Sequence, residues 1–184
     1  NTLGGQYYSS VTGLNNGGYV ATWSSYSDGS GSGVFARMYY ANGNASGDEF
    51  QVNSYTENNQ IESNVSGLSD GGFLVTWASD GQDGSGYGIY GKKYDDGANP
   101  VGNEFLINST TEFNQEYPEI TNLQDGNFVV TWMAGLNTQG TGEILGRLFD
   151  VDSNPIGNDF TIATGLTYPD YSVNETTDGG FLVS

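Results

Sequence analysis

The sequence has 184 residues, with four basic and 22 acidic side chains and a formal net charge of -18 at pH 7. A charge of this sign and size repels phosphate backbones, so nucleic acid is excluded as a partner. Cysteine is absent, which rules out disulfides and thiol chemistry, and no run of about 18 apolar residues is present that would insert into a membrane.

A unit of about 54 residues repeats along the chain. Its clearest landmark is a tryptophan that closes a short apolar segment, and Trp23, Trp77 and Trp132 lie 54 and 55 residues apart. A second landmark, an acid followed by phenylalanine, keeps the same period at Glu49-Phe50, Glu104-Phe105 and Asp159-Phe160. The approximate units are 5–55, 59–110, 114–165 and a partial unit, 166–184. Because the last unit stops one residue before a tryptophan is due, we expect one repeat domain that is a fragment of a larger one.

The second unit shows the expected elements in chain order. Alternation of side chains with a period of two predicts a strand over 73–78, and the Asp-Gly-Gly turn before it predicts a hairpin with a strand over 61–68. A Gly/Asp/Ser-rich loop over 79–88 leads to a third strand over 89–94, and a turn cluster then leads to a fourth over 104–107. No helical periodicity is sustained, so the class is all-β.

Tandem four-stranded antiparallel units of this length are typical of β-propeller blades, whose radial packing protects the sheet edges. A β-solenoid is the alternative, since glycine-rich turns between strands suit it as well. The propeller is favoured. In it, Trp77 and its equivalents would stack against the next blade, and further blades of the same chain or neighbouring chains would be the partners.

Two sets of oxygen-bearing side chains are candidate calcium ligands, which makes Ca²⁺ the candidate cofactor. The loops after the second strand carry Asp28, Asp80 and Asp83, although the third copy of this loop has no carboxylate. Asp150, Asp152 and Asn154 have the D-x-D-x-N spacing that opens many calcium loops. The rest of that loop is not kept, however, and an Asx-rich hairpin turn is the favoured alternative there.

Three of the four basic residues also follow the repeat, each on the third strand of its unit: Arg37, Lys92 and Arg147. Each unit also keeps an acid before its landmark phenylalanine. This pattern predicts a cross-strand ion pair within each unit, with a solvated outer face as the alternative.

Catalytic signals are weak. Histidine and cysteine are absent, and the serines of the loops have no base beside them to activate them. A pair of carboxylates could serve glycoside hydrolysis, but sequence cannot measure their separation. We therefore expect no enzymatic activity.

The string over 70–77, continued through 80–90 to 100–105, resembles a repeat of very large secreted bacterial proteins, many of them adhesin-like with hemolysin-type calcium-binding tails. The resemblance implies a secreted or cell-surface bacterial location and a non-enzymatic scaffold or adhesion role. The alternative is a carbohydrate-binding lectin, in which Tyr87, Tyr90 and Tyr94 would be exposed platforms that stack on surface glycans. The calcium-binding nonapeptides of such tails are absent here, so the resemblance assigns calcium to no residue.

Overall fold

The computed structural model describes residues 5–26, 29–135, 141–167 and 171–184 of the chain. Within these ranges the chain forms strands and turns without a helix, so nothing in them could cross a membrane as a helix. The strands are β1 (Gln6–Gly13), β2 (Tyr19–Ser25), β3 (Gly33–Tyr39), β4 (Phe50–Gln51), β5 (Gln60–Gly67), β6 (Phe73–Asp80), β7 (Tyr87–Tyr94), β8 (Phe105–Leu106), β9 (Gln115–Asn122), β10 (Phe128–Ala134), β11 (Thr141–Phe149), β12 (Pro155–Thr167), β13 (Val173–Glu175) and β14 (Phe181–Val183).

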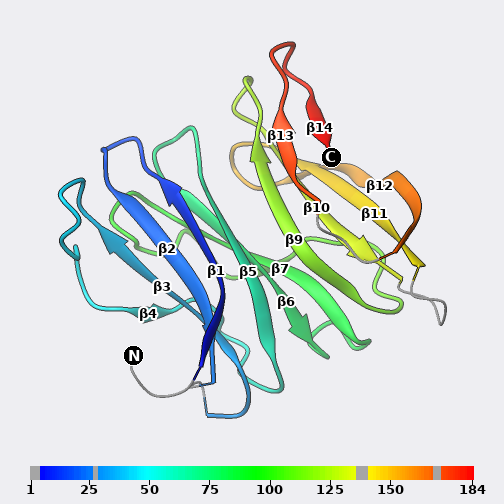
Figure 1. The fold of residues 1–184 in the computed structure, drawn as a ribbon, viewed down its shortest axis with the longest axis horizontal. Helices are drawn as coiled ribbons and strands as arrows, with labels where there is room; N and C mark the ends of the chain where they lie inside the picture. The colour runs from blue at the N-terminus through cyan, green and yellow to red at the C-terminus, as the bar shows by residue number, and fades with distance from the viewer. Residues whose placement is uncertain (1–4, 27–28, 136–140, 168–170) are drawn as a thin grey trace.

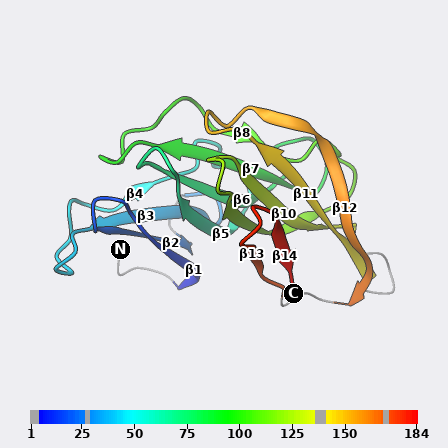
Figure 2. The ribbon, with the colours of Figure 1, turned by 90° about the horizontal axis from the view of Figure 1, so that it is seen from above.

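Consecutive strands form separate antiparallel sheets. Blade 1 has the order β1-β2-β3-β4, blade 2 β5-β6-β7-β8 and blade 3 β9-β10-β11-β12, and a hairpin of β13 and β14 follows. The first strands of the sheets, β1, β5, β9 and β13, contact one another in sequence around a common axis (Figure 1). The last strands, β4, β8 and β12, form the edge of each sheet that is farthest from this axis (Figure 2). This radial arrangement is a β-propeller, and the prediction of an all-β chain of four-stranded antiparallel units is confirmed.

The repeated turn before the second strand of each blade has a local cause. In blade 2, the Asp70 carboxylate accepts a hydrogen bond from the Gly72 N–H at 3.0 Å, which closes an Asx turn. Gly71 between them has a φ of +93°, a conformation that residues with a Cβ rarely adopt. The Asp-Gly-Gly motif is therefore a hairpin device and not part of the functional site.

The core lies between blades. Trp77, Phe73 and Val75 of blade 2 pack with Val20 and Val34 of blade 1 in one buried cluster. A second cluster joins blades 2 and 3 in the same way around Trp132. Trp77 and Trp132 thus pack against the preceding blade, and the expectation that these tryptophans would stack against the next blade is wrong. The cause is the pleat, because residues that alternate along the second strand face opposite neighbours.

The repeated acid joins one blade to the connection that enters it. The Glu104 carboxylate accepts hydrogen bonds from the main-chain N–H groups of Ser54 (2.6 Å) and Tyr55 (3.2 Å). Asp159 does the same for residues 109 and 110, at 2.9 to 3.0 Å. The ion pair expected within the unit is long in blade 3, where 3.9 Å separates Arg147 Nε from Asp159 Oδ1. The main role of these acids is therefore to fix neighbouring blades to each other.

Glu104→Ala is expected to lower the free energy of unfolding by about 1–3 kcal/mol, because two main-chain donors lose a charged acceptor. Urea denaturation followed by tryptophan fluorescence measures the change. The matched control is Asp48→Ala, an exposed acid beside the same landmark of blade 1. A loss for Glu104→Ala no larger than for this control would contradict the role of the acid as an inter-blade clamp.

Candidate active site at the propeller axis

Each blade carries a β-bulge opposite its landmark tryptophan. In blade 2, Ile61 pairs with Ala78 and Asn64 pairs with Thr76, so that two residues, Glu62 and Ser63, oppose the single residue Trp77. The register shifts at the same place in blade 1, between residues 7 and 10, and in blade 3, between residues 116 and 119. Bulges bend a strand and re-aim its side chains, and they occur often next to active sites.

The first residue of each bulge has a left-handed backbone. Tyr8, Glu62 and Tyr117 have φ angles of 51°, 59° and 57°. Bulky side chains rarely adopt such angles, which cost about 1–3 kcal/mol and persist where the surrounding fold imposes them. Here the fold imposes the same conformation three times, on the strands that line the axis.

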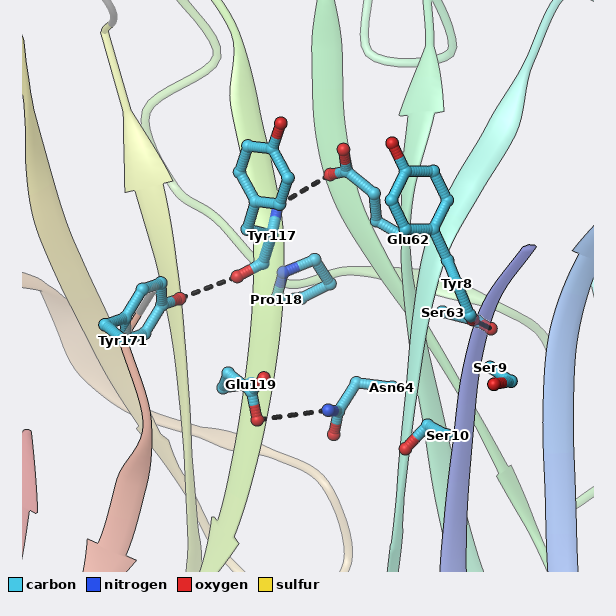
Figure 3. Close-up of a pocket in the computed structure, with 10 residues that line it drawn as sticks. All are labelled: Tyr8, Ser9, Ser10, Glu62, Ser63, Asn64, Tyr117, Pro118, Glu119 and Tyr171. Atoms are coloured by element: carbon cyan, nitrogen blue, oxygen red, sulfur yellow. Dashed lines mark hydrogen bonds between the residues drawn. The ribbon is translucent and has the colours of Figure 1, made fainter. Parts of the chain in front are cut away.

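The bulges surround a cavity of about 410 Å³. Figure 3 shows Tyr8, Glu62 and Tyr117 toward one end of it and Asn64 and Glu119 toward the other. The remaining lining residues also come from the first strands or from the segment that leads into β13: Ser9, Ser10, Ser63, Pro118 and Tyr171. A volume of several hundred Å³ at the centre of the fold, with convergent polar groups, is typical of a small-molecule site.

Glu62 is a buried carboxylic acid in this cavity. The residue is only 6% exposed, and burial raises its pKa to about 7. The Tyr117 N–H, which donates to Glu62 Oε2 at 2.7 Å, opposes the rise in pKa, while the nearby charge of Glu116 adds to it. Because only one oxygen accepts this bond, the other can carry a proton up to neutral pH. Glu62 therefore has the protonation state that a general acid needs.

Glu119 is the second carboxylate of the cavity and lies on the neighbouring strand, β9. Burial raises its pKa, and a hydrogen bond from Asn64 Nδ2 to its Oε2, at 3.1 Å, opposes that rise because it favours the ionised form. Burial also raises the pKa of Glu116, the second residue of the same strand. Two carboxyl groups whose surroundings differ in this way can take different roles in acid–base chemistry.

Buried amides hold the strands that carry these groups. Asn108 accepts a hydrogen bond from the Ile89 N–H at 2.7 Å and donates to Gln115 Oε1 at 3.2 Å. Gln115 in turn donates to the Glu112 carbonyl at 2.8 Å, which fixes the connection that leads into β9. On the far side of that strand, the Tyr171 hydroxyl donates to the Tyr117 carbonyl at 2.6 Å. Hydrogen bonds therefore fix both the start of β9 and the bulge that follows it.

The three tyrosines expected to bind glycans do not form an exposed platform. Tyr90 and Tyr94 are 7% and 2% exposed and belong to the core between blades 1 and 2, where Tyr94 stacks on Phe73 with ring centroids 5.0 Å apart. Tyr87 is partly buried beside the second core cluster. The reason is the pleat of β7, which turns Tyr90 and Tyr94 toward blade 1.

The candidate calcium ligands are spread over two turns. The Asp150 carboxylate accepts hydrogen bonds from the N–H groups of Asp152 and Asn154 at 3.0 and 2.8 Å, and these bonds close an Asx turn. The Asn154 amide lowers the pKa of Asp150 by donating to it as well. The Asx turn is the alternative that the incomplete loop motif favoured.

In the other turn, Asp83 accepts a hydrogen bond from the Ser85 N–H at 3.0 Å, and Asp80 ends β6. Asp28 lies outside the described residues. Within the described ranges, no three acidic side chains converge as a metal site would require. Calcium binding stays a prediction, and a melting temperature that does not change on addition of a chelator would contradict it.

The sequence did contain a signal for the site that was missed. Tyr8, Glu62 and Tyr117 each lie 15 residues before the landmark tryptophan of their unit. At this position the alternation of the first strand is interrupted, and the chemical character of the residue changes from one unit to the next. A position that varies in this way within a strict repeat is a candidate for function instead of packing.

No family model and no curated protein matches the chain by sequence. Solved structures do match it. A protein of unknown function from Dyadobacter fermentans shares 12% identity over 100% of this chain and 62% of its own, with a TM-score of 0.74. An endo-arabinase from Bacteroides thetaiotaomicron shares 13% over 98% and 70% (TM-score 0.62). An α-L-arabinofuranosidase from Fusarium graminearum, solved with an iminosugar inhibitor, shares 14% over 97% and 58% (TM-score 0.68).

These comparisons correct the functional predictions. The expectation of a non-enzymatic scaffold or adhesion module, or of a lectin, and the expectation that the chain is not an enzyme, are contradicted because an endo-arabinase, an α-L-arabinofuranosidase and a family-43 glycoside hydrolase share this fold. The search for catalytic motifs within one unit failed because the acids of the cavity come from different units. The chain spans 62% of the first of these structures and 58% of the arabinofuranosidase. At such low identities the likeness shows the fold.

Proposed function

We propose that the chain is the larger part of a glycoside hydrolase whose active site is the axial cavity. The observation that carries the proposal is Glu62, a carboxyl group in a left-handed bulge whose pKa burial raises to about 7. Hydrolysis of a glycosidic bond requires one carboxylic acid that is protonated near neutral pH and a second carboxylate beside it. Glu119 provides the second group.

In this mechanism, Glu62 donates its proton to the glycosidic oxygen while the bond from that oxygen to the anomeric carbon breaks. Glu119 assists the attack on the anomeric carbon from its other side, and water supplies the hydroxyl group of the released sugar. The main-chain N–H of Tyr117 orients Glu62, and the Asn64 amide orients Glu119. The anomeric configuration of the first product, read by NMR, shows whether water or the carboxylate attacks first.

The charge of the cavity narrows the substrate class. Among the described residues that line it, none is Lys or Arg, whereas Glu62 and Glu119 are acidic. A sugar that carries a carboxylate or sulfate would therefore be repelled. Neutral glycosides remain, and the endo-arabinase and the α-L-arabinofuranosidase that share the fold make arabinosides the first substrates to test.

The test is a screen of neutral aryl glycosides, beginning with the α-L-arabinofuranoside. Wild type is expected to release the aryl alcohol, and Glu119→Gln is expected to lower kcat by about 10²- to 10⁴-fold. Glu112→Gln is the matched control, because it is the same substitution at an exposed position outside the cavity. Equal rates for the control and for Glu119→Gln would overturn the assignment, and no hydrolysis of any glycoside would overturn the proposed function.

A location outside the cell and a ring completed by further blades are part of the same proposal. Polymeric glycans occur outside the bacterial cell, in keeping with the secreted location that the sequence resemblance implies. On the side of blade 1 that faces away from blade 2, Tyr19 and Trp23 are only partly buried, although the equivalent Phe73 and Trp77 are fully buried. A further blade against this face would bury them and could add residues to the cavity.

A further inference from the structure

A group of three aromatic rings, two of them exposed, continues the cavity outward over blade 1. Tyr8, which lines the cavity, is 48% exposed, and Tyr26 is 65% exposed. Tyr7 lies between them, with its ring centroid 5.1 Å from that of Tyr8 and 5.3 Å from that of Tyr26. We call these three residues the aromatic cluster.

Part of the aromatic cluster is fixed in place. The Tyr7 hydroxyl forms a hydrogen bond with the hydroxyl of Ser32, which is fully buried. The contacts with Tyr7 then restrain the two exposed rings, so that little side-chain entropy is lost when a ligand covers them. A restrained ring is a better binding surface than a mobile one.

The repeat does not require this cluster. The positions of Tyr7 and Tyr26 in blade 1 correspond to Ile61 and Asp80 in blade 2, at the same distance of 54 residues. Blade 2 keeps its strands and its core with an aliphatic and an acidic residue at these two positions. Packing therefore does not explain the aromatic residues of blade 1, and two large exposed rings next to a polar cavity need another reason.

We infer that the aromatic cluster is a second sugar-binding subsite, so that the site takes an oligosaccharide with one residue in the cavity and the next against these rings. The inference rests on the proposed function. Tyrosine offers an apolar face to the C–H groups of a sugar ring and a hydroxyl to its polar groups, as such a subsite requires. The cavity supplies the polar contacts and the cluster the apolar ones, a division that is typical of ligand sites.

The test compares substrates of different length. Wild type and Tyr26→Ala are assayed with an aryl monoglycoside and with neutral arabino- and xylo-oligosaccharides from the disaccharide to the hexasaccharide. The quantity compared is the ratio of kcat/KM for the longer substrates to kcat/KM for the monoglycoside. We expect Tyr26→Ala to lower this ratio about tenfold, because the ring acts only on the second sugar.

Tyr40→Ala is the matched control, since Tyr40 is also exposed (55%) but lies in the turn after β3. It is expected to keep the wild-type ratio. An unchanged ratio in Tyr26→Ala, or an equal loss on the monoglycoside and on the oligosaccharides, would overturn the subsite.

Failure of the proposed function gives a different result. If wild type hydrolyses none of the substrates, the subsite is judged by isothermal titration with the same oligosaccharides. Binding that tightens with chain length and weakens about tenfold in Tyr26→Ala would support it. Absence of binding, or binding that is independent of chain length, would refute the subsite as well.

Discussion

Glu62→Gln is expected to slow hydrolysis strongly and at the same time to stabilise the protein above neutral pH. Burial raises the pKa of Glu62 from 4.5 to about 7 in the folded chain. Between these two values the folded state binds more protons than the unfolded state, so the free energy of unfolding falls as the pH rises. At about 1.4 kcal/mol per pH unit, the full cost above pH 7 is roughly 3 kcal/mol.

Glutamine removes this cost and keeps the hydrogen bond. Its side-chain carbonyl can accept from the Tyr117 N–H as the carboxylate does, but it carries no charge that burial would penalise. Urea denaturation at pH 5 and pH 8 is the measurement. We expect Glu62→Gln to match wild type within about 1 kcal/mol at pH 5 and to exceed it by about 2–3 kcal/mol at pH 8.

Activity completes the test of Glu62. The variant is expected to lose about 10²- to 10⁴-fold in kcat, and wild-type activity is expected to decline above about pH 7, where a general acid loses its proton. Glu116 and Glu119 are the acidic neighbours whose charges can shift the pH at which the activity declines. A variant that gains no stability at pH 8 would contradict the buried charge, and a variant that keeps its activity would contradict the role of Glu62 as acid.

The second large effect is expected at the core. Trp77→Ala should lower the free energy of unfolding by about 3–5 kcal/mol, because the side chain is fully buried between blades 1 and 2. Its indole N–H has no hydrogen-bond partner in the described part of the chain, so the loss reflects packing. Urea denaturation monitored by far-UV circular dichroism measures the change.

Trp23→Ala is the internal comparison for this prediction. Trp23 occupies the same position in blade 1 and also has an unpartnered indole N–H, but it is only partly buried. We expect a loss of less than about half that of Trp77→Ala, in proportion to the smaller buried area. Equal losses would contradict the prediction that burial between two blades makes Trp77 contribute more to the free energy of unfolding than Trp23.

The fold was predictable because its causes are local and repeated. The Asp-Gly-Gly turn and the period-two alternation around Trp77 act within a few residues, and the repeat multiplies the signal. No unit shows a sustained helical periodicity, so the absence of helices from the described residues was predictable too. The direction in which Trp77 packs was not predictable, because the two faces of its strand are chemically similar. Only the arrangement of the blades around the axis decides which neighbouring blade each face contacts.

The site was less predictable for a related reason. Glu62 and Glu119 belong to different units, so a search within one unit finds isolated acids in a polar strand. Their pKa values depend on burial at the axis, which no segment shows alone. The acids before the landmark phenylalanines gave the opposite error, since Glu104 was expected to pair within its unit but binds the main chain at Ser54 and Tyr55.

The bulge opposite each tryptophan separates what a blade must keep from what it can change. The two residues of each bulge line the cavity and do not belong to the apolar clusters between the blades. The sequence of the bulge therefore differs between blades while the strand pairing around it is kept: Tyr8-Ser9, Glu62-Ser63 and Tyr117-Pro118. A pseudo-symmetric ring of this kind can acquire an asymmetric catalytic centre, and new specificities, through exchange of single dipeptides.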